Sequence, residues 1–225
     1  MTPKEKHRSE LDTMILKRKQ GILDQAIVEF CRNGIENTTM GDIAKASEVG
    51  IASLYRYFAS KTELVVQCAI RFWKIAEELF FPPLLTRQYD AMTGLDQIKQ
   101  MGTLLIKVYD KYKEFLIFLN DFESFLRKEK ISRPLLMNYE TEFMQFKPYF
   151  VKALEKGIQD HTIKPKYGTS PSEVENTFLI LSQIVISYAQ KLAVYSDILK
   201  PDREIDTNAQ IEAALTVLVD AIRLE

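Results

Sequence analysis

The sequence predicts an all-α protein, and three observations support that prediction. Its 225 residues include only eight Gly and eight Pro, and long stretches contain neither, which favours helix. Apolar residues recur at spacings of three and four through most of the chain, which is the period of an amphipathic helix. Hydrophobic residues make up 46% of the composition and charged residues 27%. This balance is typical of a globular protein, and the length suits two domains that share packing.

The first helix is expected over residues 10–32, where Asn33 and Gly34 end it with a left-handed cap. A cluster of basic residues lies ahead of its apolar part: Lys4, Lys6, Arg8, Lys17, Arg18 and Lys19. Such a run is most often a solvated face. The net charge of −1 gives no indication of nucleic-acid binding. If a DNA-binding motif adjoins these residues, however, contact with DNA phosphates becomes their better interpretation.

Residues 38–64 are the most informative segment, because they read as two short helices joined by a tight turn. Thr38 and Thr39 have hydroxyl groups suited to capping the first helix. Leu54 and Phe58, four residues apart, are expected to face the core. This layout is that of a helix-turn-helix, in which one helix is braced by the other and presented to the DNA major groove.

The outer surface of this motif supplies the predicted DNA-binding residues, which are Thr39, Ile51, Ala52, Ser53, Tyr55, Arg56, Tyr57 and Lys61. Thr39 and Lys61 are expected to hold phosphates, Thr39 at a helix N-terminus where backbone amides help. Tyr55 and Tyr57 could contact phosphates or thymine methyl groups. Arg56 is the residue best suited to read guanine through two hydrogen bonds.

The same segment resembles the tetracycline-repressor (TetR/AcrR) family of bacterial one-component regulators. The matching residues, in order, are Ile22, Leu23, Ala26, Phe30, Gly34, Thr38, Thr39, Asp42, Ile43, Ala44, Val49, Leu54, Tyr55, Tyr57, Phe58, Ser60, Lys61 and Leu64. The resemblance implies a three-helix DNA-binding domain, residues 1–63, followed by a helical ligand-binding and dimerisation domain, residues 64–225. It also implies a ligand-responsive repressor.

The turn of the motif departs from the family pattern at two positions. The family usually has Gly where this chain has Glu48, and Ser where it has Gly50. If the turn requires a positive φ at Glu48, the left-handed conformation costs about 1–2 kcal/mol. Gly50 deprives the second helix of a side-chain cap, and a carboxylate near phosphates weakens non-specific DNA binding.

Further helices are expected from about residue 60 to just before Pro82, then over residues 95–112, 114–129, 134–158, 172–197 and 206–224. The first of these begins at the predicted phosphate contact Lys61 and runs into the second domain. We therefore expect movement of its far end to move the DNA-binding motif.

The middle of the chain is rich in aromatic residues. Each single ring is most simply a core residue, but together they suit a flat or apolar ligand. We predict a small-molecule effector site formed by Phe72, Trp73, Tyr109, Phe118, Phe122 and Glu123.

The last two helices are apolar around most of their circumference, which indicates burial on two sides. Burial inside a single chain is one explanation, and a second subunit is the other. We predict a homodimer interface that includes Leu181, Val185, Tyr188, Leu215, Leu218 and Ile222.

No catalytic or metal-binding constellation stands out, and the two histidines, His7 and His161, lack partners at ligand spacing. We therefore expect a non-enzyme without metal or cofactor. Two cysteines, a charged start without a signal peptide and no apolar run of membrane-spanning length predict a cytoplasmic protein. The hypothesis is a homodimeric repressor that a small apolar effector releases from a palindromic operator in double-stranded DNA. The alternative is a helical ligand- or protein-binding module with weak or lost DNA binding.

Overall fold

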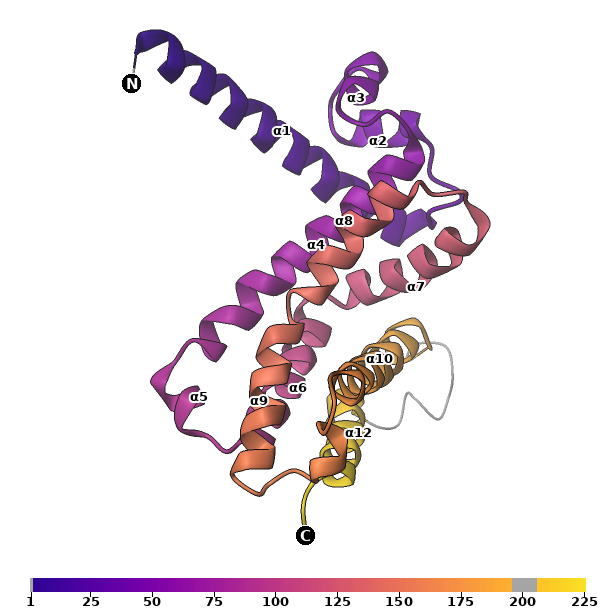
Figure 1. Cartoon of the computed structure of the whole chain (residues 1–225). Helices are drawn as coiled ribbons and strands as arrows, with labels where there is room; N and C mark the ends of the chain where they lie inside the picture. Colours follow the sequence, from indigo (N-terminus) through magenta and orange to yellow (C-terminus); the bar gives the residue numbers. More distant parts are fainter. Residues whose placement is uncertain (1, 196–205) are drawn as a thin grey trace. The chain divides into compact units, whose positions relative to one another are not determined.

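A computed structural model describes residues 2–195 and 206–225 of the chain (Figure 1). In these ranges the regular elements are helices, apart from an isolated antiparallel bridge between Ile163 and Arg223. The predicted all-α class is confirmed. The chain separates into two compact units: Met1–Trp73 with Phe118–Glu140, and Lys74–Ile117 with Thr141–Glu225. The predicted functional division after residue 63 differs from this packing division and stays a prediction.

The first unit contains the N-terminal helices and parts of three later ones. The helices are α1 (Pro3–Asn33), α2 (Met40–Ala46), α3 (Ile51–Tyr57), the start of α4 (Lys61–Leu84), the end of α7 (Lys113–Lys128) and most of α8 (Arg133–Met144). The second unit holds the rest of α4, α7 and α8. It adds α5 (Arg87–Ala91), α6 (Gly94–Lys111), α9 (Lys147–Gln159), the 3₁₀ turn η1 (Pro165–Tyr167), α10 (Pro171–Tyr195) and α12 (Thr207–Ile222).

Helix α1 begins seven residues earlier than the sequence analysis expected, at Pro3 instead of residue 10. Thr2 caps it: its hydroxyl accepts from the amide of Glu5, whose carboxylate accepts from the amide of Thr2. Pro3 occupies the first helical turn, where a missing N–H has no cost. Lys4, Lys6 and Arg8, which were expected to precede the helix, therefore lie on α1 itself.

Two other predicted boundaries are wrong, both at prolines. The single helix expected over residues 134–158 is two helices, because Pro148 has no N–H to donate to the carbonyl of Met144, where α8 ends. Helix α4 was expected to end before Pro82 but continues through Pro82 and Pro83 to Leu84. Neither proline has an N–H, so each removes one backbone hydrogen bond from the last turn of α4.

The core of the first unit joins α1 to the helix-turn-helix and to α7. Phe30 of α1 stacks on Phe118 of α7 with ring centroids 6.1 Å apart, and both side chains are buried. Leu54 and Phe58 are fully buried, as predicted, so α3 is anchored through one face. Thr38 is also buried, and its hydroxyl donates to the carbonyl of Gly34 at 2.9 Å.

In the second unit α6 packs against both α9 and α12. Its core includes Leu95 and Ile98 of α6, Leu154 of α9 and Phe178 of α10. The first turn of α6 approaches α9 closely at Gly94, where a Cβ atom would lie 2.0 Å from the backbone nitrogen of Gly157. The amide of Gly94 donates to the Asp160 carboxylate at 2.8 Å, which satisfies one of the free donors at this helix start.

Helix α10 has the length and apolar composition of a membrane-spanning helix. The sequence analysis missed this, because serine and glutamine residues interrupt the apolar run. In this structure Phe178, Val185 and Leu192 of α10 are buried within the protein. Length and composition alone are weak indications of a membrane span, because core helices share them.

Candidate nucleic-acid interface

Helix α2 begins with a reciprocal cap that the sequence predicts in part. The Thr39 hydroxyl accepts from the amide of Asp42 at 3.2 Å, and the Asp42 carboxylate accepts from the Thr39 amide at 2.9 Å. The Thr39 hydroxyl also donates to that carboxylate at 2.6 Å. The hydrogen bond from the Thr39 hydroxyl lowers the pKa of the Asp42 carboxyl most, and the hydrogen bond from the Thr39 amide lowers it further. Thr38, the other predicted cap, is instead buried beneath the loop.

The turn between α2 and α3 contains a residue in the left-handed region. Glu48 has a φ of 54°, the conformation expected if Glu occupies the position of a turn glycine. The amide of Glu48 donates to Lys45 O at 3.2 Å, and the amide of Val49 donates to Ala44 O at 2.9 Å. Gly50 is the N-cap of α3 and provides no side-chain hydrogen bond. The turn therefore carries a conformational cost of about 1–2 kcal/mol.

Helix α3 presents the predicted DNA-binding residues on its outer side. Ile51 and Tyr55 are about half exposed. Ala52 and Arg56 are also exposed, whereas Ser53 and Tyr57 are partly buried, as the burial pattern shows. An Arg56 nitrogen, Nη2, donates to the Ser53 hydroxyl at 2.9 Å. This bond holds the guanidinium along the helix surface.

Lys61 lies at the first residue of α4 and has protein partners of its own. Its Nζ donates to the carbonyl of Glu36 at 3.2 Å. Partial burial lowers the pKa of Lys61, and the carboxylates of Glu129 and Glu36 partly oppose this effect. Glu36 in turn pairs with Lys128 at the end of α7. Sequence reasoning missed this cluster, because its members are far apart along the chain.

The basic residues of α1 divide into two groups. Lys6, Arg8, Lys17 and Arg18 are exposed, and Lys19 is partly buried. Arg18 and Lys19 contact the helix-turn-helix: Arg18 Nη2 donates to the carbonyl of Glu48 at 3.1 Å, and Lys19 Nζ lies 5.1 Å from the centre of the Phe58 ring.

The predicted effector residues are distributed over both units. Phe72, Trp73, Phe118, Phe122 and Glu123 belong to the first unit, and Tyr109 belongs to the second. The four rings of the first unit are buried, Glu123 is exposed, and Tyr109 packs in a second-unit core cluster with Ile106 and Leu192.

Within the first unit the aromatic rings form a continuous cluster. Phe72 and Trp73 meet edge to face at 5.5 Å, Phe118 stacks with Phe122 at 6.0 Å, and Phe122 meets Tyr139 of α8 at 5.1 Å. Burial raises the pKa of Tyr139. The sequence analysis did not include Tyr139 in the effector set.

The predicted dimer residues fall into two classes. Val185, Leu215 and Ile222 are buried inside the second unit, whereas Leu181, Tyr188 and Leu218 are partly exposed. The large hydrophobic side chains that are exposed on these helices are different ones. They are Ile180 (55% exposed), Ile184 (45%) and Tyr195 (42%) on α10 and Val217 (69%) on α12, followed by Leu224 after α12.

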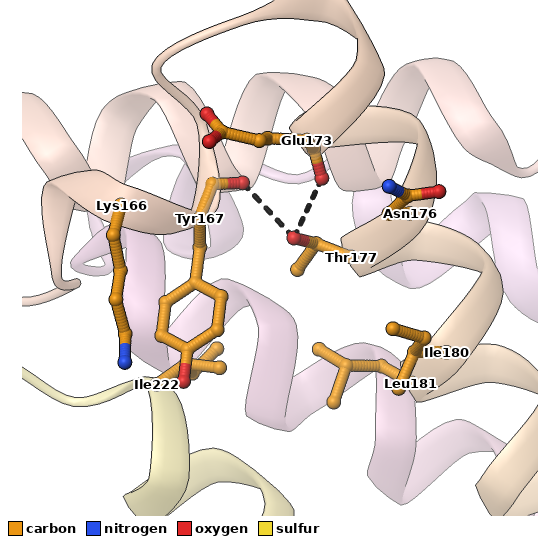
Figure 2. A pocket seen from close by; sticks show the side chains of 8 residues that line it. All are labelled: Lys166, Tyr167, Glu173, Asn176, Thr177, Ile180, Leu181 and Ile222. Carbon is orange, nitrogen blue, oxygen red and sulfur yellow. Dashed lines mark hydrogen bonds between the residues drawn. The ribbon is translucent and has the colours of Figure 1, made fainter.

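A cavity of about 210 Å³ lies beside Ile180, where η1, the start of α10 and the end of α12 meet (Figure 2). Ile180, Leu181 and Ile222 form its apolar side. The Thr177 hydroxyl lies between the carbonyls of Tyr167 and Glu173, at 3.0 and 2.8 Å, and donates to them. No group of three or more potential metal-binding His, Cys, Asp or Glu side chains occurs among the described residues.

Residues 22–68 match the family model described as bacterial regulatory proteins, tetR family. The chain is similar to the probable acrEF/envCD operon repressor of Escherichia coli K12, at 39% identity over 49 residues, which is 22% of each protein. It is 28% identical over 114 residues to the biofilm operon negative regulator IcaR of Staphylococcus epidermidis, over 49% of this chain and 58% of IcaR. These alignments span less than two thirds of either relative.

Solved structures match the fold along most of the chain. A putative regulator from Saccharomonospora viridis in complex with choline has a TM-score of 0.67 at 13% identity, covering 93% of this chain and 98% of that one. FadR from Bacillus subtilis in complex with stearoyl-CoA has a TM-score of 0.63 at 16% identity, covering 90% and 98%. The fold and the motif thus define a helical protein with an N-terminal helix-turn-helix. Residues 22–68 are similar in sequence to the bacterial regulatory proteins of the tetR family.

Proposed function

We propose that the protein is a ligand-responsive, DNA-binding transcriptional regulator, and specifically a repressor. The observation that carries this proposal is α3 itself. Its buried side is held by Leu54 and Phe58, while its outer side presents Tyr55 and Arg56. A short helix with this much exposed polar and aromatic surface suits a DNA groove. Two relatives are described as a repressor and a negative regulator, which supports repression as the proposed role of this protein.

The DNA-binding residues are proposed as the sequence analysis named them, with separate roles. Thr39 and Lys61 lie at helix starts, where they suit phosphates. Arg56 suits the major-groove edge of guanine once its hydrogen bond to Ser53 is exchanged for bonds to the base. Lys61 keeps the Glu36 carbonyl as one partner and has further N–H groups available for a phosphate.

The protein is further proposed to act as a homodimer in the cytoplasm. The exposed sides of the last two helices carry an apolar strip made of Ile180 and Ile184 on α10 and Val217 on α12. Ala213 and Ala221, also exposed, flank Val217 on the same side of α12. Helices α10 and α12 contact each other, which supports the proposal that their exposed apolar residues act as one surface. A two-fold pair of these surfaces gives the two DNA-binding motifs that a palindrome requires.

The effector is proposed to be small and apolar or aromatic, bound against the aromatic cluster of the first unit. Because Phe118 and Phe122 are fully buried, a ligand must separate rings in order to enter. Trp73 lies on the same helix as Lys61, about 18 Å along it at 1.5 Å per residue. Ring separation that tilts α4 would change the position of Lys61. The effector would then lower the affinity for the operator by the same factor by which the operator lowers the affinity for the effector.

The DNA-contact roles predict different effects for two substitutions. Lys61→Ala should weaken binding to all duplexes and lower the salt dependence by about one ion, because a phosphate contact is lost. Arg56→Ala should make the free energy of binding to the preferred duplex less favourable by about 1–3 kcal/mol. It should also reduce the discrimination among bases at one base pair. Fluorescence anisotropy with duplexes selected in vitro from random sequence measures both effects. If the unmodified protein selects no sequence over random duplex at moderate salt, the regulator proposal fails and a module without DNA binding is supported.

The effector proposal predicts a fluorescence signal from Trp73, which is the only tryptophan. Titration with planar apolar compounds should quench or shift its emission, because the indole is 6% exposed and contacts Phe72. A compound that changes the emission should also weaken operator binding in parallel. Tight binding near Trp73 with unchanged operator affinity would contradict the coupling through α4.

A further inference from the structure

The turn before α3 and the residue after it both contact α1 through neighbouring side chains. Arg18 donates to the carbonyl of Glu48 in the turn, at 3.1 Å. Lys19 places its ammonium 5.1 Å from the centre of the Phe58 ring, and Phe58 is the C-cap of α3. Two consecutive residues of α1 therefore contact the segments that precede and follow the proposed DNA-binding helix.

Arg18 contacts a residue whose backbone lies in the left-handed region. Glu48 has a φ of 54°, which a side-chain-bearing residue adopts only at a cost. Gly50, two residues later, contributes no cap to α3. The turn thus lacks both usual sources of stability, a glycine at the left-handed position and a side-chain cap at the helix start. A charged hydrogen bond to the carbonyl of the strained residue is the described contact that compensates.

We propose that Arg18 is a positioning residue for operator binding: it holds the strained Glu48 turn, and through it the start of α3, in the DNA-binding conformation. This inference rests on the proposed function and revises the role expected of the basic residues on α1. Arg18 acts through Glu48 instead of a phosphate. Lys19 helps to hold the C-terminal end of α3 through its contact with the Phe58 ring. Lys17, exposed on the same helix, is the neighbouring cation free to meet a phosphate.

A double-mutant cycle between Arg18 and Glu48 separates this role from a phosphate contact. Arg18→Met keeps the aliphatic part of the side chain but removes the hydrogen-bond donor. Glu48→Gly removes the conformational cost, because glycine adopts positive φ freely. If Arg18 compensates for that cost, its loss should weaken DNA binding when position 48 is Glu. It should weaken DNA binding little when position 48 is Gly.

The probe is a duplex selected in vitro from random sequence by the unmodified full-length protein. Arg18→Met should weaken binding to it about five- to tenfold. In the Glu48→Gly background the same substitution should weaken binding by less than about twofold. The slope of affinity against salt should not change in either background. Lys17→Met is the matched control, since it removes one charge from the same turn of α1 and should lower that slope by about 0.9.

A second measurement needs no DNA, so it separates failure of this inference from failure of the proposed function. Amide hydrogen exchange in residues 47–50 should be faster in Arg18→Met than in the unmodified protein or in Lys17→Met. The Glu48→Gly substitution should reduce the difference. Equal losses of affinity in both backgrounds with a slope lowered by about 0.9 would assign Arg18 to a phosphate. That outcome, or unchanged exchange in Arg18→Met, overturns the positioning role.

Discussion

Replacing Val217 by Glu is expected to convert the proposed dimer into a monomer and to weaken operator binding by about 100-fold or more. Val217 is 69% exposed in the single chain and lies at the centre of the apolar strip on α12. In a dimer that buries this strip, the new carboxylate would have no partner, and its desolvation is unfavourable. Loss of the second DNA-binding motif removes the avidity that links two half-sites. Sedimentation velocity and operator titration measure the two effects.

Leu85→Glu is the control for this experiment. Leu85 is also 69% exposed and apolar, but it follows α4 instead of lying on α10 or α12. The substitution should leave both the sedimentation coefficient and the operator affinity unchanged. If Val217→Glu and Leu85→Glu behave alike, the strip on α10 and α12 is not the dimer interface.

Replacing Gly94 by Ala should destabilise the protein by about 3 kcal/mol, at the upper end of the range for overpacking. The added Cβ would lie 2.0 Å from Gly157 N and 2.4 Å from the carbonyl oxygen of Ala153. Both are backbone atoms of α9, so no side-chain rotation relieves the contact. Helix α6 must therefore move away from α9, which opens the core around Leu95 and Leu154. Urea unfolding of the full chain measures the change in free energy.

Replacing Gly21 by Ala should change the free energy of unfolding in the opposite direction. Gly21 lies within α1, is exposed, and has no atom within 4 Å of an added Cβ. Gly21→Ala should therefore stabilise the protein by about 0.5–1 kcal/mol through reduced backbone entropy of the unfolded chain. A stability change below about 0.5 kcal/mol for Gly94→Ala would contradict the close packing of α6 on α9.

Local signals made the helix-turn-helix predictable from sequence. The cap at Thr39 and the buried pair Leu54 and Phe58 depend on spacings of three and four residues, which the sequence displays directly. The positive φ of Glu48 was considered only as a condition, from the glycine that the TetR/AcrR family usually has at this position, and the structure shows it. The early start of α1 had a readable signal as well, in the order Thr2, Pro3 and Glu5, that the sequence analysis overlooked.

Contacts between distant segments could not be predicted in the same way. The contact of Arg18 with Glu48 joins residues 30 apart in sequence, and the cluster of Glu36, Lys61 and Lys128 spans a longer separation. On α10 and α12 the apolar band is so wide that the sequence does not show which side faces the protein's own core. Val185 and Leu215 therefore entered the predicted dimer set, although the structure buries both within the second unit.

We propose that two copies of this chain bind a palindromic DNA site through α3. Selection from random duplex by the unmodified full-length protein, followed by sedimentation of the protein with the selected duplex, tests both parts of this proposal. Inverted repeats should be enriched, and two protomers should bind each duplex. Enrichment of no sequence, or a single protomer on an unrepeated site, would contradict it.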